Sequence, residues 1–276
     1  MDDEPDWLRV MTFNLLVARP VSPRPWRDRR PLAGELLDRA RPHLLGTQEG
    51  LAGPLRDLAD DLGADRYGWV GQGRDGGDRG EFAAIGYDRE RLEALDSGHF
   101  WLSDTPDVPG SETWGGCCTR MVTWVRLRDL AAGGELLAVN THFDHESAYA
   151  RERAAELLAA RLRVLAPGLP RVVTGDFNAP ADDPVHAALL DAADLVDTWD
   201  VAERRGPALG TFHDHRPPVP GGERIDWILV SRGTRVREAA VDDFARDGRR
   251  PSDHLPVRAL VRVAGGGGDE GEVDAG

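Results

Sequence analysis

The chain has 276 residues, of which 41% are hydrophobic, and this is enough to bury a core, so the composition argues against a disordered or fibrous protein. Its 48 acidic residues exceed its 34 basic residues, which gives a net charge of −14, and every basic residue in that count is an arginine. This charge argues against a protein held to nucleic acid or to an anionic membrane mainly by general electrostatics, because a polyanion would be repelled at long range.

Regular hydrophobic patterns in the first 63 residues predict alternating strands and helices. Apolar alternation over residues 7–13 predicts a strand, and a Pro- and Arg-rich connection follows up to Pro31. A stripe of leucines after Pro31 predicts a helix that ends at Pro42. A short apolar strand over 43–47 and a second helix over 51–62 complete this region.

The middle of the chain, from residue 67 to 125, has a different pattern of turn-forming residues. Clusters of Gly, Asp and Pro separate short segments, so we expect a largely antiparallel region with strands at 81–87, 99–102 and 121–127.

Strands and helices alternate again in the second half. The pattern predicts strands at 135–141, 171–174, 225–231 and 255–263, a helix at 154–165, and a helix through Ala192 that is capped by Asp183 and Pro184. No long linker interrupts the chain, so we expect one α/β domain over residues 1–264. The glycine-rich and acidic segment 265–276 is expected to be a disordered tail.

The amino terminus, the lack of a long apolar stretch and the cysteines predict where in the cell this protein is found. The acidic amino terminus does not resemble a secretory signal, and no stretch approaches the roughly 18 apolar residues that a membrane span needs. The only cysteines, Cys117 and Cys118, are adjacent, a spacing at which an ordinary disulfide is strained and a tetrahedral thiolate site lacks partners. We expect a cytoplasmic monomer without membrane insertion.

Polar residues gather where apolar strands end, and such ends converge on one edge of the sheet in α/β enzymes. The groups at the predicted carboxyl ends, or just before the last strand, are Asn14, Gln48-Glu49, Asn140-Thr141-His142, Asp176-Phe177-Asn178, Asp226 and Ser252-Asp253-His254.

Five of these segments together resemble the ordered motifs of the endonuclease/exonuclease/phosphatase superfamily, which includes deoxyribonuclease-I-like nucleases and inositol polyphosphate 5-phosphatases. The segments are Met11-Thr12-Phe13-Asn14, Thr47-Gln48-Glu49, Gly175-Asp176-Phe177-Asn178, Arg224-Ile225-Asp226-Trp227-Ile228 and Ser252-Asp253-His254-Leu255-Pro256-Val257. The resemblance runs from about residue 7 to 263. It implies a four-layer α-β-β-α sandwich with two facing mixed β-sheets and an active site at one edge.

The resemblance also implies a divalent-metal-dependent hydrolase that cleaves phosphoester bonds by metal-assisted in-line attack of water. Phosphoester hydrolysis needs positive charge, a base for water and hydrogen-bond donors. Glu49 offers the hard carboxylate that Mg²⁺ or Mn²⁺ prefers, and Asp253 is a candidate second metal ligand.

The other polar groups have roles in this scheme. Asp176 and Asn178 lie two apart, so in an extended segment both point to one side while Phe177 turns into the core; a turn formed by Asp and Asn is the alternative. By the resemblance, Asp176 orients or deprotonates water and Asn178 donates to a phosphate oxygen. In the expected pair Asp226–His254, the carboxylate fixes the imidazole and favours its charged form, which can stabilise the transition state or hold the nucleophilic water.

Further positions follow from the resemblance or from charge alone. His142 resembles the second histidine of the deoxyribonuclease-I and phosphatase branches, Asn14 a group that hydrogen-bonds the metal-bound water or a carboxylate, and Glu81 a residue that supports the histidine. Candidate substrate contacts are Arg120, Arg151 and the ring of Trp114, for which a core or loop-anchoring position is the alternative. Expected substrates are a phosphorylated small molecule, a phosphodiester or a short nucleic acid.

Two other functions are compatible with parts of the sequence. The chain could be a non-catalytic binding module on the same fold. His142-Phe143-Asp144-His145 also reproduces the last four positions of the metal-binding signature of metallo-β-lactamase-like hydrolases, with Asn140 in place of the first histidine. That second alternative leaves the motifs around Asp176 and His254 unexplained.

Overall fold

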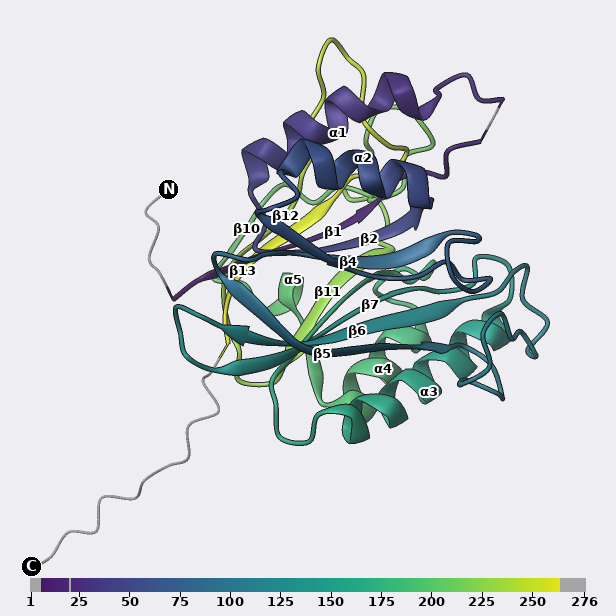
Figure 1. Cartoon of the computed structure of the whole chain (residues 1–276), viewed down its shortest axis with the longest axis vertical. Coiled ribbons are helices and arrows are strands. Elements are labelled where there is room, and N and C mark those ends of the chain that lie inside the picture. The colour runs from purple at the N-terminus through teal and green to yellow at the C-terminus, as the bar shows by residue number, and fades with distance from the viewer. Residues whose placement is uncertain (1–5, 20, 264–276) are drawn as a thin grey trace, which may run out of the picture.

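Two β-sheets face each other in the centre of the molecule, and helices cover their outer faces (Figure 1). The computed structural model describes residues 6–19 and 21–263, and the tail expected at 265–276 lies outside these residues. Within the described residues, none of the helices combines the length and the apolar composition that a bilayer span requires.

The first sheet has seven strands and carries both ends of the described chain. In spatial order they are β10 (Arg204–Arg205), β12 (Arg235–Val241), β13 (Val257–Arg262), β1 (Leu8–Asn14), β2 (Leu44–Gly50), β4 (Phe82–Asp88) and β3 (Tyr67–Val70). Strands β1 and β2 are parallel, so their carboxyl ends lie at the same edge.

The second sheet has six strands. In spatial order they are β5 (Leu92–Trp101), β6 (Met121–Asp129), β7 (Glu135–His142), β8 (Arg171–Asp176), β11 (Asp226–Ser231) and β9 (Leu195–Asp197). Strands β7 and β8 are parallel, whereas β11 runs antiparallel to β8 with Asp226 opposite Asp176. The strands between residues 67 and 125 pair in antiparallel fashion, as the clusters of turn-forming residues predict.

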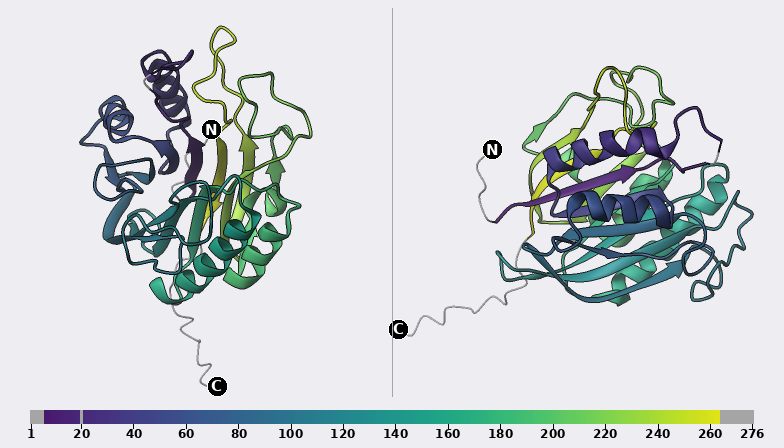
Figure 2. Two further views of the ribbon diagram at one scale, coloured as in Figure 1. Left: turned by 90° about the vertical axis from the view of Figure 1, so that its right-hand side faces the viewer. Right: turned by 45° about the horizontal axis from the view of Figure 1, so that its top comes forward.

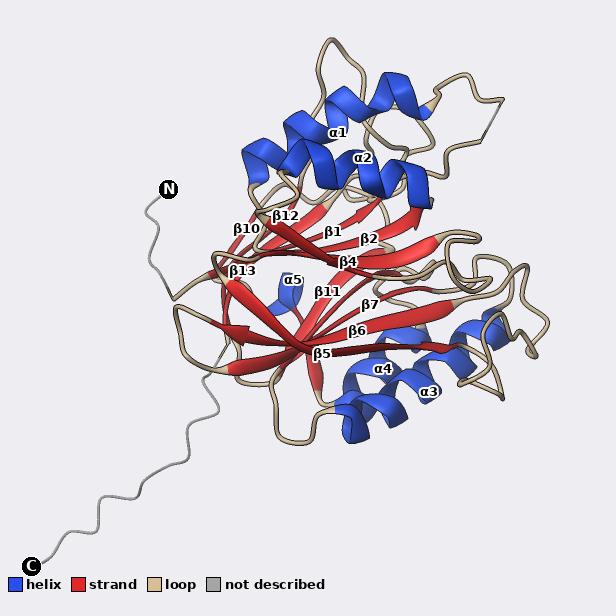
Figure 3. Cartoon of the chain, in the orientation of Figure 1, coloured by secondary structure: helices blue, strands red, loops and turns tan. Residues whose placement is uncertain are grey.

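Each sheet has its own helical layer (Figures 2 and 3). Helices α1 (Trp26–Ala40) and α2 (Ala52–Leu62) cover the first sheet, and α3 (Ala148–Leu165) and α4 (Pro184–Ala193) cover the second, while α5 (Thr198–Val201) is a single short turn. The predicted cap of α4 forms, because the Asp183 side chain accepts a hydrogen bond from Val185 N. The four-layer α-β-β-α architecture is thereby confirmed.

Alternation along the strands divides the core into layers. On β1, Leu8 and Val10 pack between the two sheets, whereas Met11 and Phe13 pack against α1 and α2. Successive side chains of a strand point to opposite faces, so one apolar strand supplies both layers. A third layer lies between the second sheet and helices α3 and α4 and includes Leu158.

The local structure differs from the expectations in several places. Helix α1 begins at Trp26 rather than after Pro31, because buried contacts of Trp26 and Arg29 stabilise its first turns. The sequence pattern also missed β3, β9, β10 and β12. In β12 a shift of register between Val236 and Glu238 interrupts the two-residue alternation by which a strand is recognised.

Candidate active site

Polar side chains from both sheets meet at one edge of the sandwich. The carboxyl ends of β1 and β2 bring Asn14 and Glu49, and those of β7 and β8 bring His142 and Asp176. The sequence analysis placed Asp226 at the carboxyl end of a strand, but it is the first residue of β11. It reaches the same edge because β11 is antiparallel to β8.

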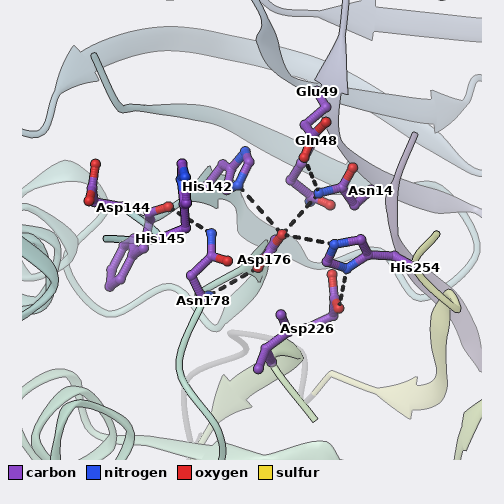
Figure 4. Close-up of polar contacts among 12 residues, drawn as sticks. Asn14, Gln48, Glu49, His142, Asp144, His145, Asp176, Asn178, Asp226 and His254 are labelled. Atoms are coloured by element: carbon purple, nitrogen blue, oxygen red, sulfur yellow. Dashed lines mark hydrogen bonds and ion pairs between the residues drawn. The ribbon is translucent and has the colours of Figure 1, made fainter. Parts of the chain in front are cut away.

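Asp176 lies at the centre of the site, and three side chains point toward its carboxyl group (Figure 4). Its Oδ2 atom accepts a hydrogen bond of 2.9 Å from Asn14 Nδ2, and lies 3.5 Å from His142 Nε2 and 3.7 Å from His254 Nε2. Burial and the neighbouring Asp226 carboxylate raise the pKa of Asp176 to about 7. This carboxyl group can therefore exchange a proton near neutral pH.

Glu49 is held in the site by its backbone and by two donors. Its φ angle of 61° lies in the left-handed region, and the register of β2 against β4 shifts between Thr47 and Gly50. Asn14 Nδ2 donates to its Oε1 at 2.9 Å, and Val17 N donates to its Oε2 at 2.7 Å. Backbone strain of this kind persists where surrounding contacts over-determine the conformation, and it often marks a functional residue.

The segment after β8 is a turn rather than the expected extended segment. Asn178 has a φ angle of 48°, and its N–H donates to Asp176 Oδ1 at 3.0 Å, as in a turn closed by an Asp side chain. Phe177 does point into the core, where it stacks on Trp227. Asn178 Nδ2 donates to Phe143 O at 3.0 Å, which leaves its second amide hydrogen for a ligand.

His254 and Asp226 form the expected pair. His254 Nδ1 lies 2.9 Å from Asp226 Oδ2, and both side chains are buried. Burial alone would lower the pKa of His254, but the carboxylates of Asp226 and Asp176 outweigh it and raise the pKa to about 10. This imidazole is therefore a cation at neutral pH.

His142 has the opposite electrostatic setting. Burial and the positive charges of Arg120 and His254 lower its pKa well below the usual histidine value. His142 is therefore neutral at neutral pH, and the two histidines beside Asp176 differ in charge.

A buried polar network joins the sheets beneath the site. Gln48 Nε2 donates to Asn140 Oδ1 at 2.7 Å, and Thr174 Oγ1 donates to the same oxygen at 3.1 Å. Gly46 makes this approach possible, because a Cβ atom there would lie 2.1 Å from Thr174 Oγ1. Gln48 and Asn140 were marked by the sequence only as polar strand ends, and the structure shows that they join the two sheets.

The charges of the site fit a divalent cation. Four carboxyl groups contribute: Glu49, Asp176, Asp226 and Asp253. In the part of the chain that the structure describes, the cation that pairs with Asp176 and Asp226 is His254, His142 is a neutral neighbour of Asp176, and no arginine forms an ion pair with these carboxyl groups. Ligand atoms of Glu49, His142 and Asp176 lie within 4.8 Å of one another. A hard cation is thus suited to Glu49, which supplies anionic oxygens beside Asp176.

Two other predicted residues lie at the margin of the site. Among the described residues, Asp253 does not join Glu49, His142 and Asp176 in their cluster of potential metal ligands. Burial raises the pKa of Asp253, and the nearby Glu49 carboxylate raises it further. Glu81 forms an ion pair of 2.8 Å with Arg74, and it lines a small cavity together with His142. Its carboxylate is therefore engaged by an arginine.

The candidate substrate contacts differ in their exposure. Arg120 lines the same cavity as His142 and is 6% exposed. Arg151 donates to Asp144 O at 3.0 Å. Trp114 does not offer the expected stacking surface, because its ring is buried in the core beside α3 and its Nε1 donates to Asp104. The alternative of a loop anchor describes Trp114 better.

The metallo-β-lactamase-like alternative does not fit the geometry. His142 groups with Glu49 and Asp176, whereas Asp144 groups with Cys117 and Cys118. The pattern in the sequence therefore contributes to two separate clusters instead of one metal centre.

Two residues that shape the site were missed by the sequence interpretation. Phe212 is 50% exposed, and its ring lies 5.0 Å from the ring of His254. Arg29 is buried and donates to the carbonyl oxygens of Leu16 and Pro251, which joins the loop after β1 to the loop before His254. Neither has a sequence signal beyond its residue type.

Comparisons with known proteins show the family and the fold of this chain. The model of the Endonuclease/Exonuclease/phosphatase family matches residues 11–254, a range that contains all of the candidate residues. A search of curated proteins finds no match.

Solved structures share the fold over nearly the whole chain. A family protein from Bacteroides vulgatus is 31% identical with a TM-score of 0.88, covering 93% of this chain and 99% of that one. A mannosyl-6-phosphatase from Bacteroides thetaiotaomicron is 32% identical with a TM-score of 0.85, covering 92% and 99%. TDP2 from D. rerio, complexed with a single-strand DNA product, is 17% identical with a TM-score of 0.71, covering 92% and 98%, and shows likeness of fold alone.

Proposed function

This chain belongs to the endonuclease/exonuclease/phosphatase family, and from that premise we propose that it is a divalent-metal-dependent hydrolase of phosphoester bonds. One observation carries the proposal: Asp176 Oδ2 lies within 3.7 Å of nitrogen atoms from Asn14, His142 and His254. These groups provide a base and donors at one place, as hydrolysis of a phosphate ester requires.

Each side chain has a task in this reaction. Asp176, with its pKa raised to about 7, accepts a proton from the attacking water, since a base works best when its pKa is near the operating pH. The His254 imidazolium, fixed by Asp226, donates to a phosphate oxygen and stabilises the charge that develops there. Neutral His142 and the second amide hydrogen of Asn178 donate to the remaining oxygens.

Glu49 would hold the metal ion, with Asn14 keeping its carboxyl group beside that of Asp176. Bound Mg²⁺ or Mn²⁺ would neutralise negative charge on the phosphate. Asp253 is a further candidate ligand.

We further propose a small phosphate monoester, such as a sugar phosphate, as the substrate. The mannosyl-6-phosphatase that this chain resembles acts on such a compound by its name, and it is 32% identical over 92% of this chain. The net charge of −14 adds support, because it opposes long-range attraction of a long nucleic acid.

A substrate panel tests both proposals. The pure protein is assayed with Mn²⁺ or Mg²⁺ on hexose 6-phosphates, p-nitrophenyl phosphate, bis-(p-nitrophenyl) phosphate, RNA and plasmid DNA. We expect turnover of monoesters that EDTA abolishes and that added metal restores. If only diesters or nucleic acids are hydrolysed, the proposal of a phosphoesterase stands and the proposal of a monoester substrate is rejected.

The non-catalytic alternative has a distinct outcome in the same experiment. A binding module would turn over none of these compounds. Calorimetry with Mn²⁺ separates the cases further, because the proposed centre predicts saturable binding that is weakened in Glu49→Gln.

A further inference from the structure

Two features of the sequence have no part in the proposed function. They are the adjacent cysteines Cys117 and Cys118, and the residues Asp144 and His145, which follow β7. The fold brings them together: Cys117 N donates a hydrogen bond of 2.8 Å to Asp144 Oδ2 across 27 positions of sequence. The cysteine pair therefore has the partners that it lacks in the sequence.

Three potential ligands form a compact cluster, and a fourth, His145, contacts it through Cys117. Cys117 Sγ is 3.0 Å from Cys118 Sγ and 3.2 Å from His145 Nδ1. Ligand atoms of Cys117, Cys118 and Asp144 all lie within 4.8 Å of one another. Two sulfur atoms, one imidazole nitrogen and one carboxylate oxygen form the donor set of a tetrahedral zinc site.

The nitrogen and the oxygen are already oriented. Arg120 Nη2 lies 3.1 Å from His145 Nδ1, and because a guanidinium only donates, Nδ1 is the acceptor and carries a lone pair. A metal ion would take this lone pair in place of Arg120. The Asp144 carboxylate accepts hydrogen bonds from the backbone N–H groups of Cys117, Glu146 and Ser147, which fix its position. Such support is typical of metal ligands.

The loop that carries the cysteines is anchored just before them. Trp114 is buried in the core and donates to Asp104. Gly116 lets the loop close on Asp144, because a Cβ atom at this position would lie 2.6 Å from Asp144 Oδ2. The sulfur atoms remain reachable from solvent, since Cys117 is exposed and Cys118 is half-buried.

We propose that Cys117, Cys118, Asp144 and His145 form a second metal site, separate from the site at Glu49 and Asp176, that binds a thiophilic divalent cation of the Zn²⁺ type. Thiolate and imidazole ligands favour Zn²⁺ over Mg²⁺ and Mn²⁺. Zn–S bonds of about 2.3 Å at tetrahedral angles put two sulfur atoms about 3.7 Å apart. The present separation of 3.0 Å thus needs only a small outward movement.

Cadmium titration of the reduced full-length protein, with Mg²⁺ in excess to fill the carboxylate site, tests the proposal. Thiolate ligation to Cd²⁺ gives an ultraviolet charge-transfer band, and the chain has only 2 cysteines, so the band reports on this pair alone. We expect the band to saturate at one Cd²⁺ per chain and to disappear when Zn²⁺ competes. Absence of a saturable band would overturn the proposal.

Variants separate the four-ligand site from a simple thiol pair. Asp144→Asn and His145→Ala should each weaken Cd²⁺ binding by at least the roughly 10-fold that loss of even an outer partner costs a metal site. His145→Ala is the safer variant for folding, because this side chain is 54% exposed. Glu49→Gln is the matched control and should leave the band and its affinity unchanged.

Two results would contradict the assignment even if a band appears. Unchanged affinity in both Asp144→Asn and His145→Ala would mean that the thiols bind alone. Saturation at one Cd²⁺ per two chains, together with a dimer in size-exclusion chromatography, would mean that the thiols bridge two molecules.

Discussion

Asn14 donates a hydrogen bond of 2.9 Å to Asp176, although the two residues lie 162 positions apart and belong to different sheets. The same amide group donates to Glu49 at 2.9 Å. One side chain therefore sets the distance between the two carboxylates to which we assign the metal and the water.

The first prediction concerns this bridge. Asn14→Ala removes the donor shared by Glu49 and Asp176, so their repulsion is no longer offset and metal affinity should fall by about 10–100-fold, the usual effect of losing a supporting partner. The measurement is the Mg²⁺ concentration at half-maximal activity. An unchanged metal dependence in folded protein would show that Asn14 does not position these groups.

The second prediction concerns the base. Asp176→Asn keeps the shape of the side chain but cannot accept a proton, so the rate should fall by about 10²–10⁴-fold. Asp38→Asn is a matched control, because Asp38 is an exposed carboxylate on α1 that pairs with Arg41, and it should keep full activity. Activity of Asp176→Asn near that of the control would reject the role of Asp176.

The third prediction concerns the charge of His254. Its pKa is raised to about 10 by Asp226 and Asp176, so NMR titration should show the imidazolium persisting well above pH 7. In Asp226→Asn the pKa of His254 should move down toward the usual histidine value, because the Asp226 carboxylate, which raises it most, is lost. A titration near pH 6.5 in the unmodified protein would contradict the geometry.

This pKa shift also makes the free energy of unfolding depend on pH. Because the pKa of His254 is higher in the folded than in the unfolded chain, its contribution is fully present below about pH 6.5 and is lost as pH rises through about 10. Unfolding by denaturant between these limits should show that decline, and Asp226→Asn should flatten it.

The fourth prediction concerns the contact between the sheets. Gly46→Ala places a Cβ atom against Thr174 Oγ1 and Asn140 Oδ1, so we expect a loss of about 1–3 kcal/mol in the free energy of unfolding, as for other overpacked cores. Gly53→Ala on α2 is the control, since a Cβ atom there would meet no other part of the described chain within 4 Å, and helix propensity favours alanine there. Equal stability of both variants would show that the sheets can separate at low cost.

Much of the architecture could be predicted where patterns are local. The alternation in β1 and the Asp183 cap of α4 each depend on a few neighbouring residues, and both occur in the structure. The first turns of α1 could not be predicted, because Arg29 is satisfied there by carbonyl oxygens as distant as that of Pro251. The bulge in β12 is likewise stabilised by its partner strand and hides the strand from a pattern search.

By itself, the sequence determined the family and the set of polar groups at the strand ends, because these depend on residue types and their order along the chain. Only the tertiary structure decided that the two histidines beside Asp176 carry different charges, that Asp144 lies with the cysteines instead of with His142, and that His145 contacts Cys117. The physical reason is that charge and ligand geometry depend on burial and on neighbours across two sheets, which no spacing in one dimension specifies.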